Sequence, residues 1–218
     1  MTFKKKVRLL NEYDHKTNLS AKDFKRLLAL AGDKEKLIRS MTAAVLSNFV
    51  NIDSEKVLLK LACDKSSLVR AESYDSLSSF DSTKVQKFLK KAILREKNEI
   101  AWAYAVIAWA EISAHKKKQY EFLKEIKNLA KSKKSEHCLL SFYYAKYLLQ
   151  NKKIEKILNF LNSEDYHIRC SAINLLWNII STENKDLIAQ ALENLLIEES
   201  CASVSDNANK LLSFINTM

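Results

Sequence analysis

The chain has 218 residues, of which 47% are hydrophobic, and its 36 Lys and Arg outnumber its 26 Asp and Glu. It contains no Pro and one Gly. This excludes folds rich in β-strands or long loops, whose tight turns depend on those residues. A single Gly also excludes a glycine-rich phosphate-binding loop. The composition therefore predicts an all-α protein that is large enough to bury a substantial apolar core.

The cysteines and the first residues indicate a reduced protein that is not secreted. Cys63, Cys138, Cys170 and Cys201 are scattered and form no C-x-x-C pair, so we expect reduced thiols without a redox motif. The basic residues 4–6 are followed by residues too polar for the apolar part of a signal peptide. The longest apolar run falls well short of the roughly 20 residues that span a bilayer. We expect a cytoplasmic protein without membrane insertion.

Hydrophobic periodicity divides the chain into a capping segment and about six helix pairs. Residues 1–18 are basic, have apolar residues at helical spacing, and are expected to form the capping helix. Each later pair has an A helix and a B helix joined by a short polar turn. The pairs are expected at residues 20–50, 53–80, 82–113, 116–150, 152–181 and 182–217, within one domain of residues 1–218. The pattern does not fix the phase of the fourth pair.

One spacing recurs along the B helices. An aliphatic residue at position 0 is followed by Arg, by a small residue at +4 and by large apolar residues at +8 and +11. The template begins at Ile38, Val69 and Ile168. Looser copies begin at Ala101, where Trp replaces the Arg, and at Val204, where Ser does. Such a period is typical of helical solenoids.

Local signals mark the helix ends. Ser20, followed by an Asp at the third position after it, resembles a capping box. Asp53, the Asp81-Ser82 pair and Asp165 are the next expected N-terminal caps. Gly32 follows an apolar run and is expected to end the first A helix in the left-handed conformation.

Three units carry a longer pattern, D-x-x-x-x-V-R-x-x-A-x-x-A-L. Asp33 precedes Ile38-Arg39, Asp64 precedes Val69-Arg70, and the copy at Ile168-Arg169 lacks the leading Asp. These units resemble the short variety of the HEAT repeat family. The resemblance implies a right-handed α-solenoid, an α-α superhelix. It also implies a structural ladder between adjacent units, made by Asp33, Asp64, Arg39, Arg70 and Arg169. Because the other units lack Arg, we expect an interrupted ladder. Repeats of this kind specify architecture rather than activity.

Charge is unevenly distributed. Residues 1–160 hold 33 Lys and Arg against 18 Asp and Glu, whereas residues 161–218 hold 3 against 8. A basic surface can bind a polyanion, because neutralised phosphates release counterions. Candidate contacts are Lys87, Lys91, Lys117 and Lys124. Most of the lysines belong to A helices, which we expect on the convex face.

The B helices should line the concave groove, and positions +2, +3, +6 and +10 of each B helix should face it. These positions are mostly small, polar, aromatic or acidic, which suits a protein or peptide partner. The alternative is that the tyrosines only pack against adjacent units. The candidate groove residues are Met41, Glu72, Asp75, Tyr104, Glu111, Tyr143, Tyr147 and Asn174.

Enzymatic alternatives have little support in the sequence. HEAT-like alkylpurine DNA glycosylases use aromatic side chains and a carboxylate, for which Trp102, Trp109 and Glu111 would be the ingredients. Their paired Trp-Trp-Asp type motif is absent, and Trp109 occupies a core position of the template. No His is followed by Glu, as HEAT-repeat di-iron hydroxylases require.

A zinc site is the one metal hypothesis that the spacing suggests. His137-Cys138 and His167 with Cys170 could meet across a seam between repeats. We assign no catalytic residue, metal or cofactor. The sequence favours a non-enzymatic scaffold for a protein or peptide partner. The alternative is a nucleic-acid-binding protein, possibly related to the glycosylases.

Overall fold

The computed structural model describes residues 1–114, 120–150 and 153–218, with the side chain of residue 120 left out. These residues form helices and no strand. They divide into two compact units, unit 1 from Met1 to Ala145 and unit 2 from Lys146 to Met218. The single domain of residues 1–218 stays a prediction.

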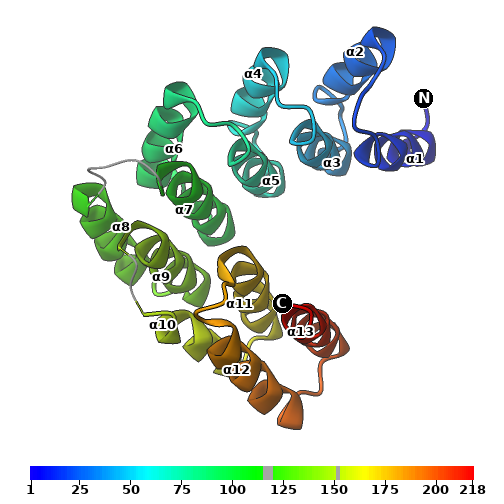
Figure 1. The fold of residues 1–218 in the computed structure, drawn as a ribbon. Helices are drawn as coiled ribbons and strands as arrows, with labels where there is room; N and C mark the ends of the chain where they lie inside the picture. The colour runs from blue at the N-terminus through cyan, green and yellow to red at the C-terminus, as the bar shows by residue number, and fades with distance from the viewer. Residues whose placement is uncertain (115–119, 151–152) are drawn as a thin grey trace. The chain divides into compact units, whose positions relative to one another are not determined.

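Unit 1 is a stack of helix pairs behind an N-terminal helix. Figure 1 shows α2, α4 and α6 in one layer and α1, α3, α5 and α7 in the other. The helices are α1 Phe3–Asp14, α2 Ala21–Leu30, α3 Lys36–Leu46, α4 Ile52–Leu61, α5 Ser67–Leu77, α6 Thr83–Arg95, α7 Glu99–Ser113, α8 Tyr120–Lys133 and α9 Glu136–Gln150, which extends into unit 2. The capping helix and the all-α class are confirmed.

The core of unit 1 follows the repeat template. Ile38, Val69 and Ala101, the residues at position 0, are fully buried. The small residues at +4 are buried too, and two of them bond back to position 0: Thr42 Oγ1 and Ser73 Oγ each donate to the carbonyl four residues earlier, both at 2.6 Å. Each B helix therefore packs against its neighbours through the predicted face.

The two layers of unit 1 pack differently. The B helices α3, α5 and α7 contact one another extensively, more than any A helix contacts its neighbours along the stack. The layer of α2, α4 and α6 is accordingly more open, as Figure 1 shows. Because the B helices pack more closely than the A helices, unit 1 curves toward its B helices.

Most helix starts agree with the expected caps. Ser20, Ser82 and Asp165 are N-terminal caps, and the side chain of each accepts a hydrogen bond from a backbone N–H of the first turn. The cap of α4 is Asn51 rather than Asp53, since the Asn51 side chain accepts from the N–H groups of residues 53 and 54 at 3.0 Å.

The expectation for Gly32 is wrong. Its φ is not positive, and only Lys134, with φ 56°, is a non-glycine residue in the left-handed region among the described residues. The turn after α2 tightens instead through backbone bonds from residues 31, 32 and 33 to carbonyls three residues earlier. Such bonds satisfy the last carbonyls of a helix without a left-handed residue.

Unit 2 continues the alternation. It contains α10 Glu155–Leu158, a 3-10 helix η1 Asn159–Asn162, α11 Tyr166–Ile179, α12 Lys185–Glu198 and α13 Ala202–Ile215. The A helix expected before α11 is thus short and ends as a 3-10 turn. Its predicted apolar residues Ile154, Ile157, Leu158 and Leu161 are all buried.

An ionic ladder joins successive repeats. Arg39 donates from Nε and Nη2 to both oxygens of Asp64, at 2.7 and 2.8 Å. From Nη1 it donates to the carbonyls of residues 33 and 34 in its own repeat. Arg70 holds Glu96 in the same way, with both bonds at 2.7 Å. Bidentate pairs of this kind fix geometry as well as supplying energy.

The ladder is longer than we expected from the sequence. Lys6 of α1 pairs with Asp33, so the capping helix supplies a rung. In unit 2, Arg169 donates to both oxygens of Glu199, at 2.6 and 2.8 Å. Glu96 and Glu199 stand five residues before position 0, as Asp33 and Asp64 do. This spacing was the signal that could have identified both glutamates.

Candidate functional site

The exposed side of α3, α5 and α7 forms a continuous surface, which we call the B-helix face. Positions −1, +3, +6 and +10 of the template fall on one side of a helix. No residue at these positions is buried, and the +10 residues Asn48 and Ser79 lie just beyond the ends of α3 and α5. The face consists of Leu37, Met41, Ala44 and Asn48, then Leu68, Glu72, Asp75 and Ser79, then Ile100, Tyr104, Ile107 and Glu111.

A row of exposed aliphatic side chains runs along the B-helix face. Leu37, Leu68 and Ile100 occupy position −1 in consecutive repeats and are 45%, 45% and 49% exposed. Sequence reasoning missed this row because it took the exposed side to begin at position +2. The residues at +2, such as Ser40 and Ala71, are buried instead. A large aliphatic residue directly before position 0 was the available signal.

The centre of the B-helix face is acidic. Burial and the nearby Asp75 carboxylate raise the pKa of Glu72 to about 7. Asp75 reaches solvent, yet the surrounding protein raises its pKa as well. On the next helix, burial and these two carboxylates raise the pKa of Tyr104. The structure thus brings together Glu72, Asp75 and Tyr104, and a cationic group placed among them would relieve the repulsion between the two acids.

The other predicted groove residues have partners inside their own units. Glu111 is half-buried and accepts a hydrogen bond from the Tyr144 hydroxyl at 2.9 Å. Tyr143 is half-buried, and its ring lies 5.1 Å from that of Phe142. Met41 is half-buried beside the aliphatic row.

Two predicted groove residues belong to unit 2. Tyr147 is half-buried, and its hydroxyl accepts a hydrogen bond from Asn184 at 3.2 Å. Asn174 is exposed on α11.

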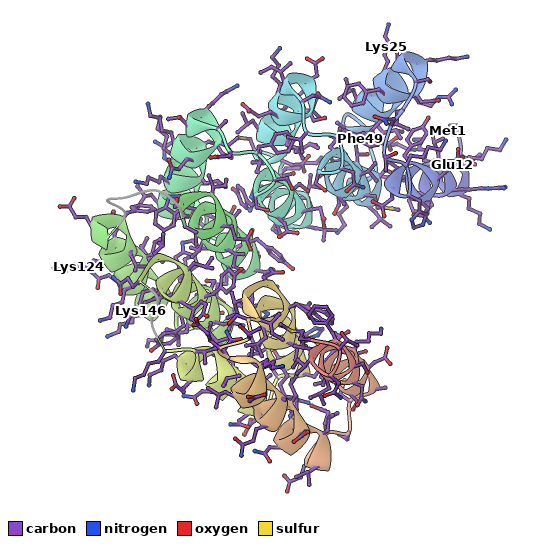
Figure 2. The ribbon with its side chains drawn as sticks, viewed as in Figure 1. Met1, Glu12, Lys25, Phe49, Lys124 and Lys146 are labelled. Atoms are coloured by element: carbon purple, nitrogen blue, oxygen red, sulfur yellow. The ribbon has the colours of Figure 1, made fainter. Side chains whose placement is uncertain are left out.

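The predicted polyanion contacts lie on A helices. Lys87 and Lys91 are exposed on α6 and Lys124 is exposed on α8, while Lys117 lies outside the described residues. Figure 2 shows Lys25 and Lys124 pointing away from the B helices of unit 1. Lys90 differs from them, since its ammonium lies 5.0 Å from the centre of the Phe122 ring.

The ingredients of a glycosylase site do not reach the surface. Trp102 and Trp109 are fully buried, which confirms that Trp109 is a core residue. Trp102 donates from Nε1 to the carbonyl of Ile93 at 2.9 Å. Trp109 packs edge to face on Phe122 with the ring centres 4.9 Å apart. Neither indole can stack on a base extruded from DNA.

Neither a cluster of metal-ligating side chains nor a membrane-spanning helix is found in the part of the chain that is described. No three His, Cys, Asp or Glu side chains in residues 1–114, 120–150 and 153–218 gather in a way that could hold a metal ion. Burial raises the pKa of the Cys138 thiol to about 11, so this thiol is a poor metal ligand at neutral pH. None of the described helices is long and apolar enough to cross a membrane.

Comparisons with known proteins agree with this architecture. Residues 24–110 match the family model described as HEAT repeats, and no curated protein matches the chain. One similar solved structure is a chain in the complex of CpcE and CpcF of phycocyanin lyase from Nostoc sp. PCC7120. It has a TM-score of 0.67 and 16% identity, and the match covers 97% of this chain and 88% of that one. YibA of Escherichia coli gives a TM-score of 0.54 at 17% identity, over 98% and 76%.

Likeness at such identities concerns the fold alone. The repeat template, the ladder and the matched family model agree on the same residues. Residues 24–110 of this chain are therefore HEAT repeats, within a HEAT-like fold that extends over nearly the whole chain.

Proposed function

We propose that this protein is a non-enzymatic scaffold that binds a segment of a partner protein along the B-helix face. The observation that carries the proposal is the row of Leu37, Leu68 and Ile100. Side chains of this size, half exposed and repeated over three consecutive units, present apolar area that a partner can bury. The similar chain from Nostoc was itself solved in a complex of two proteins.

The partner segment should have two chemical features. Aliphatic or aromatic side chains would cover the row at position −1. A Lys or Arg would reach Glu72 and Asp75, whose pKa values are raised by burial and, for Glu72, also by the Asp75 carboxylate. Tyr104, which is 39% exposed, offers a ring for the stem of that basic residue. Interfaces of this kind derive most of their affinity from a few buried apolar and aromatic anchors.

The test uses peptides selected from a random display library against the full chain. Replacing Leu37, Leu68 and Ile100 together with Ser should weaken the selected peptides on the order of 100-fold. Burying the exposed half of each side chain is worth about 1 kcal/mol, and about 3 kcal/mol in sum corresponds to that factor.

A matched control comes from the opposite layer. Leu94 of the A helix α6 is 49% exposed, and Leu94→Ser should leave peptide affinity unchanged. The scaffold hypothesis fails when the triple variant keeps its affinity, or when Leu94→Ser loses as much. Asp75→Lys should separately remove any preference for Lys and Arg among the selected peptides.

Nucleic-acid binding is the second candidate, favoured by the excess of basic residues in the first 160. Its contacts would be Lys87, Lys91 and Lys124, all exposed on A helices. Anisotropy of labelled DNA and RNA should then fall steeply between about 50 and 200 mM salt, and charge reversal at these lysines should reduce the salt dependence. Binding that ignores both salt and the lysines would exclude this mode.

A further inference from the structure

A cleft opens between the A helices α4 and α6 of unit 1. Its volume is about 420 Å³, and it is lined by the end of α4, by one face of α6 and by Tyr74 of α5. The cleft has a simple physical origin. The B helix α5 packs closely on α3 and α7, whereas α4 and α6 pack much less closely on each other. The small side chains Ala62 and Ala92 face the resulting space without filling it.

The inner part of this cleft is mainly apolar. Phe88 and Ala92 lie one turn apart on α6 and are only partly covered, while Tyr74 is buried. At the base, Arg70 and Glu96 neutralise each other through their paired hydrogen bonds. The Tyr74 hydroxyl donates to Glu96 at 3.2 Å. The base therefore carries no surplus charge.

The rim of the cleft is cationic. Lys91 and Arg95 repeat at helical spacing beside Phe88 and Ala92, and Lys97 follows α6. All three cations are exposed. Within the described part of the chain, no hydrogen bond or ion pair engages any of them, in contrast with the ladder arginines. Cations grouped at the mouth of an apolar cleft attract anions more strongly than scattered surface charges do.

We propose that this cleft binds a small amphipathic anion, in which a carboxylate, sulfonate or phosphate is attached to an aromatic or aliphatic body. The acidic group lies among Lys91, Arg95 and Lys97, and the apolar body covers Phe88 and Ala92. The volume is within the range of small-molecule sites, which combine an apolar lining with a few charged groups. An inorganic anion alone would leave the apolar part of the cleft exposed to water. A neutral apolar molecule would leave the cations without a partner.

Binding can be measured directly with 1-naphthyl phosphate as the probe on the full chain, by calorimetry. We expect the probe to bind at least 10-fold more tightly than either 1-naphthol or inorganic phosphate. The double variant Lys91→Gln with Arg95→Gln should lose about 10-fold or more. The control, Lys87→Gln with Lys124→Gln, removes two exposed cations outside the cleft and should bind as the unaltered protein does.

Alkylation of Cys63 supplies a second readout. Its thiol is exposed and lines the cleft, so bound probe should slow its alkylation, followed by mass spectrometry of the peptide that contains it. A cation within about 7 Å in water raises the local concentration of a monovalent anion roughly two- to three-fold. The ratio of the iodoacetate rate to the iodoacetamide rate at Cys63 should therefore be higher in the unaltered protein than in the Lys91→Gln with Arg95→Gln protein.

Three results would overturn the proposal: no probe binding at millimolar concentration, equal losses in the cleft and control variants, or binding that leaves Cys63 unprotected. Equal losses would indicate general attraction by the basic A helices. Because the cleft and the B-helix face lie in opposite layers of unit 1, either proposal can fail without the other.

Discussion

Replacing Arg70 with Met should destabilise unit 1 by about 2–4 kcal/mol at pH 7. Removing one partner of a buried ion pair typically costs about 3–5 kcal/mol. The upper end is reduced here because the Arg70 side chain is 20% exposed, while that of Glu96 is only 4% exposed. In the variant, the buried Glu96 carboxylate loses its cation and keeps only the hydrogen bonds from Asn98 N–H and the Tyr74 hydroxyl. It also removes the donor to the carbonyls of residues 64 and 65.

The loss should depend on pH in a defined direction. Burial acts to raise the pKa of Glu96, but the hydrogen bonds from Arg70 and from Asn98 N–H hold it below the ordinary value of 4.5. The intact pair thus adds stability above that value, which is lost as the pH falls through the lowered pKa. Without Arg70, burial dominates and the pKa of Glu96 rises. The part of the penalty that comes from the buried carboxylate then shrinks as the pH falls, so the difference between the two proteins should be smaller at about pH 4 than at pH 7. The lost donor to the carbonyls of residues 64 and 65 leaves a remainder that does not depend on pH.

Urea unfolding followed by tryptophan fluorescence measures this difference. Trp102 and Trp109 are buried in unit 1, and a Trp177→Phe background removes the indole of unit 2, so the signal reports unit 1. Arg26→Met is the matched control. Arg26 is 50% exposed, and its Nη1 lies 3.9 Å from Asp23 Oδ1, which is a long distance for an ion pair. Such surface pairs contribute about 0–1 kcal/mol. Equal costs for Arg70→Met and Arg26→Met, or a cost that does not change between about pH 4 and 7, would refute the reasoning.

Three smaller predictions follow from single residues. Lys134→Gly should stabilise the protein by roughly 0.5–1 kcal/mol in thermal unfolding, because a side chain at φ 56° is strained; an unchanged or lower midpoint would contradict this. Asn51→Ala should cost about 1 kcal/mol as a lost cap, and Asp53→Ala should cost less. The side-chain carboxyl of Glu72 should titrate near pH 7 by NMR, and Asp75→Asn should lower that pKa by removing the neighbouring charge. An ordinary pKa for Glu72 would contradict the described acidic centre.

The repeat spacing was enough to predict the helices and their core faces. Ile38, Val69 and Ile168 are buried as expected because one apolar stripe must face the neighbouring units wherever helices stack. The template succeeded even at Ala101, where the Arg is missing. There, Trp102 takes the place of the Arg in the core, and the Lys133 ammonium donates to the carbonyl of Glu96 at 3.1 Å.

The sequence was less informative about surfaces. Glu96 and Glu199 were missed as ladder residues because the motif carries Asp, although the longer Glu side chain forms the same bidentate pair. Leu37 and Leu68 were not recognised as exposed, since an aliphatic residue next to a core position has the composition of the core. Exposure of such a residue depends on the angle at which neighbouring helices pack, which one sequence does not contain.

The distribution of free charge separates the two layers of unit 1. The B helices α5 and α7 contain a single basic residue, Arg70, which the ladder already binds. The A helix α6 between them contains four lysines and Arg95. Around α5 and α7, the cations available to a ligand therefore lie on α6, and the carboxylates of Glu72 and Asp75 lie on the B-helix face. Affinity for a polyanion should respond to salt and to Lys91 but not to Leu68. Affinity for a basic, apolar peptide should respond to Leu68 and Asp75 but not to Lys91. A variant of one layer that abolished both affinities would show that the layers do not act separately.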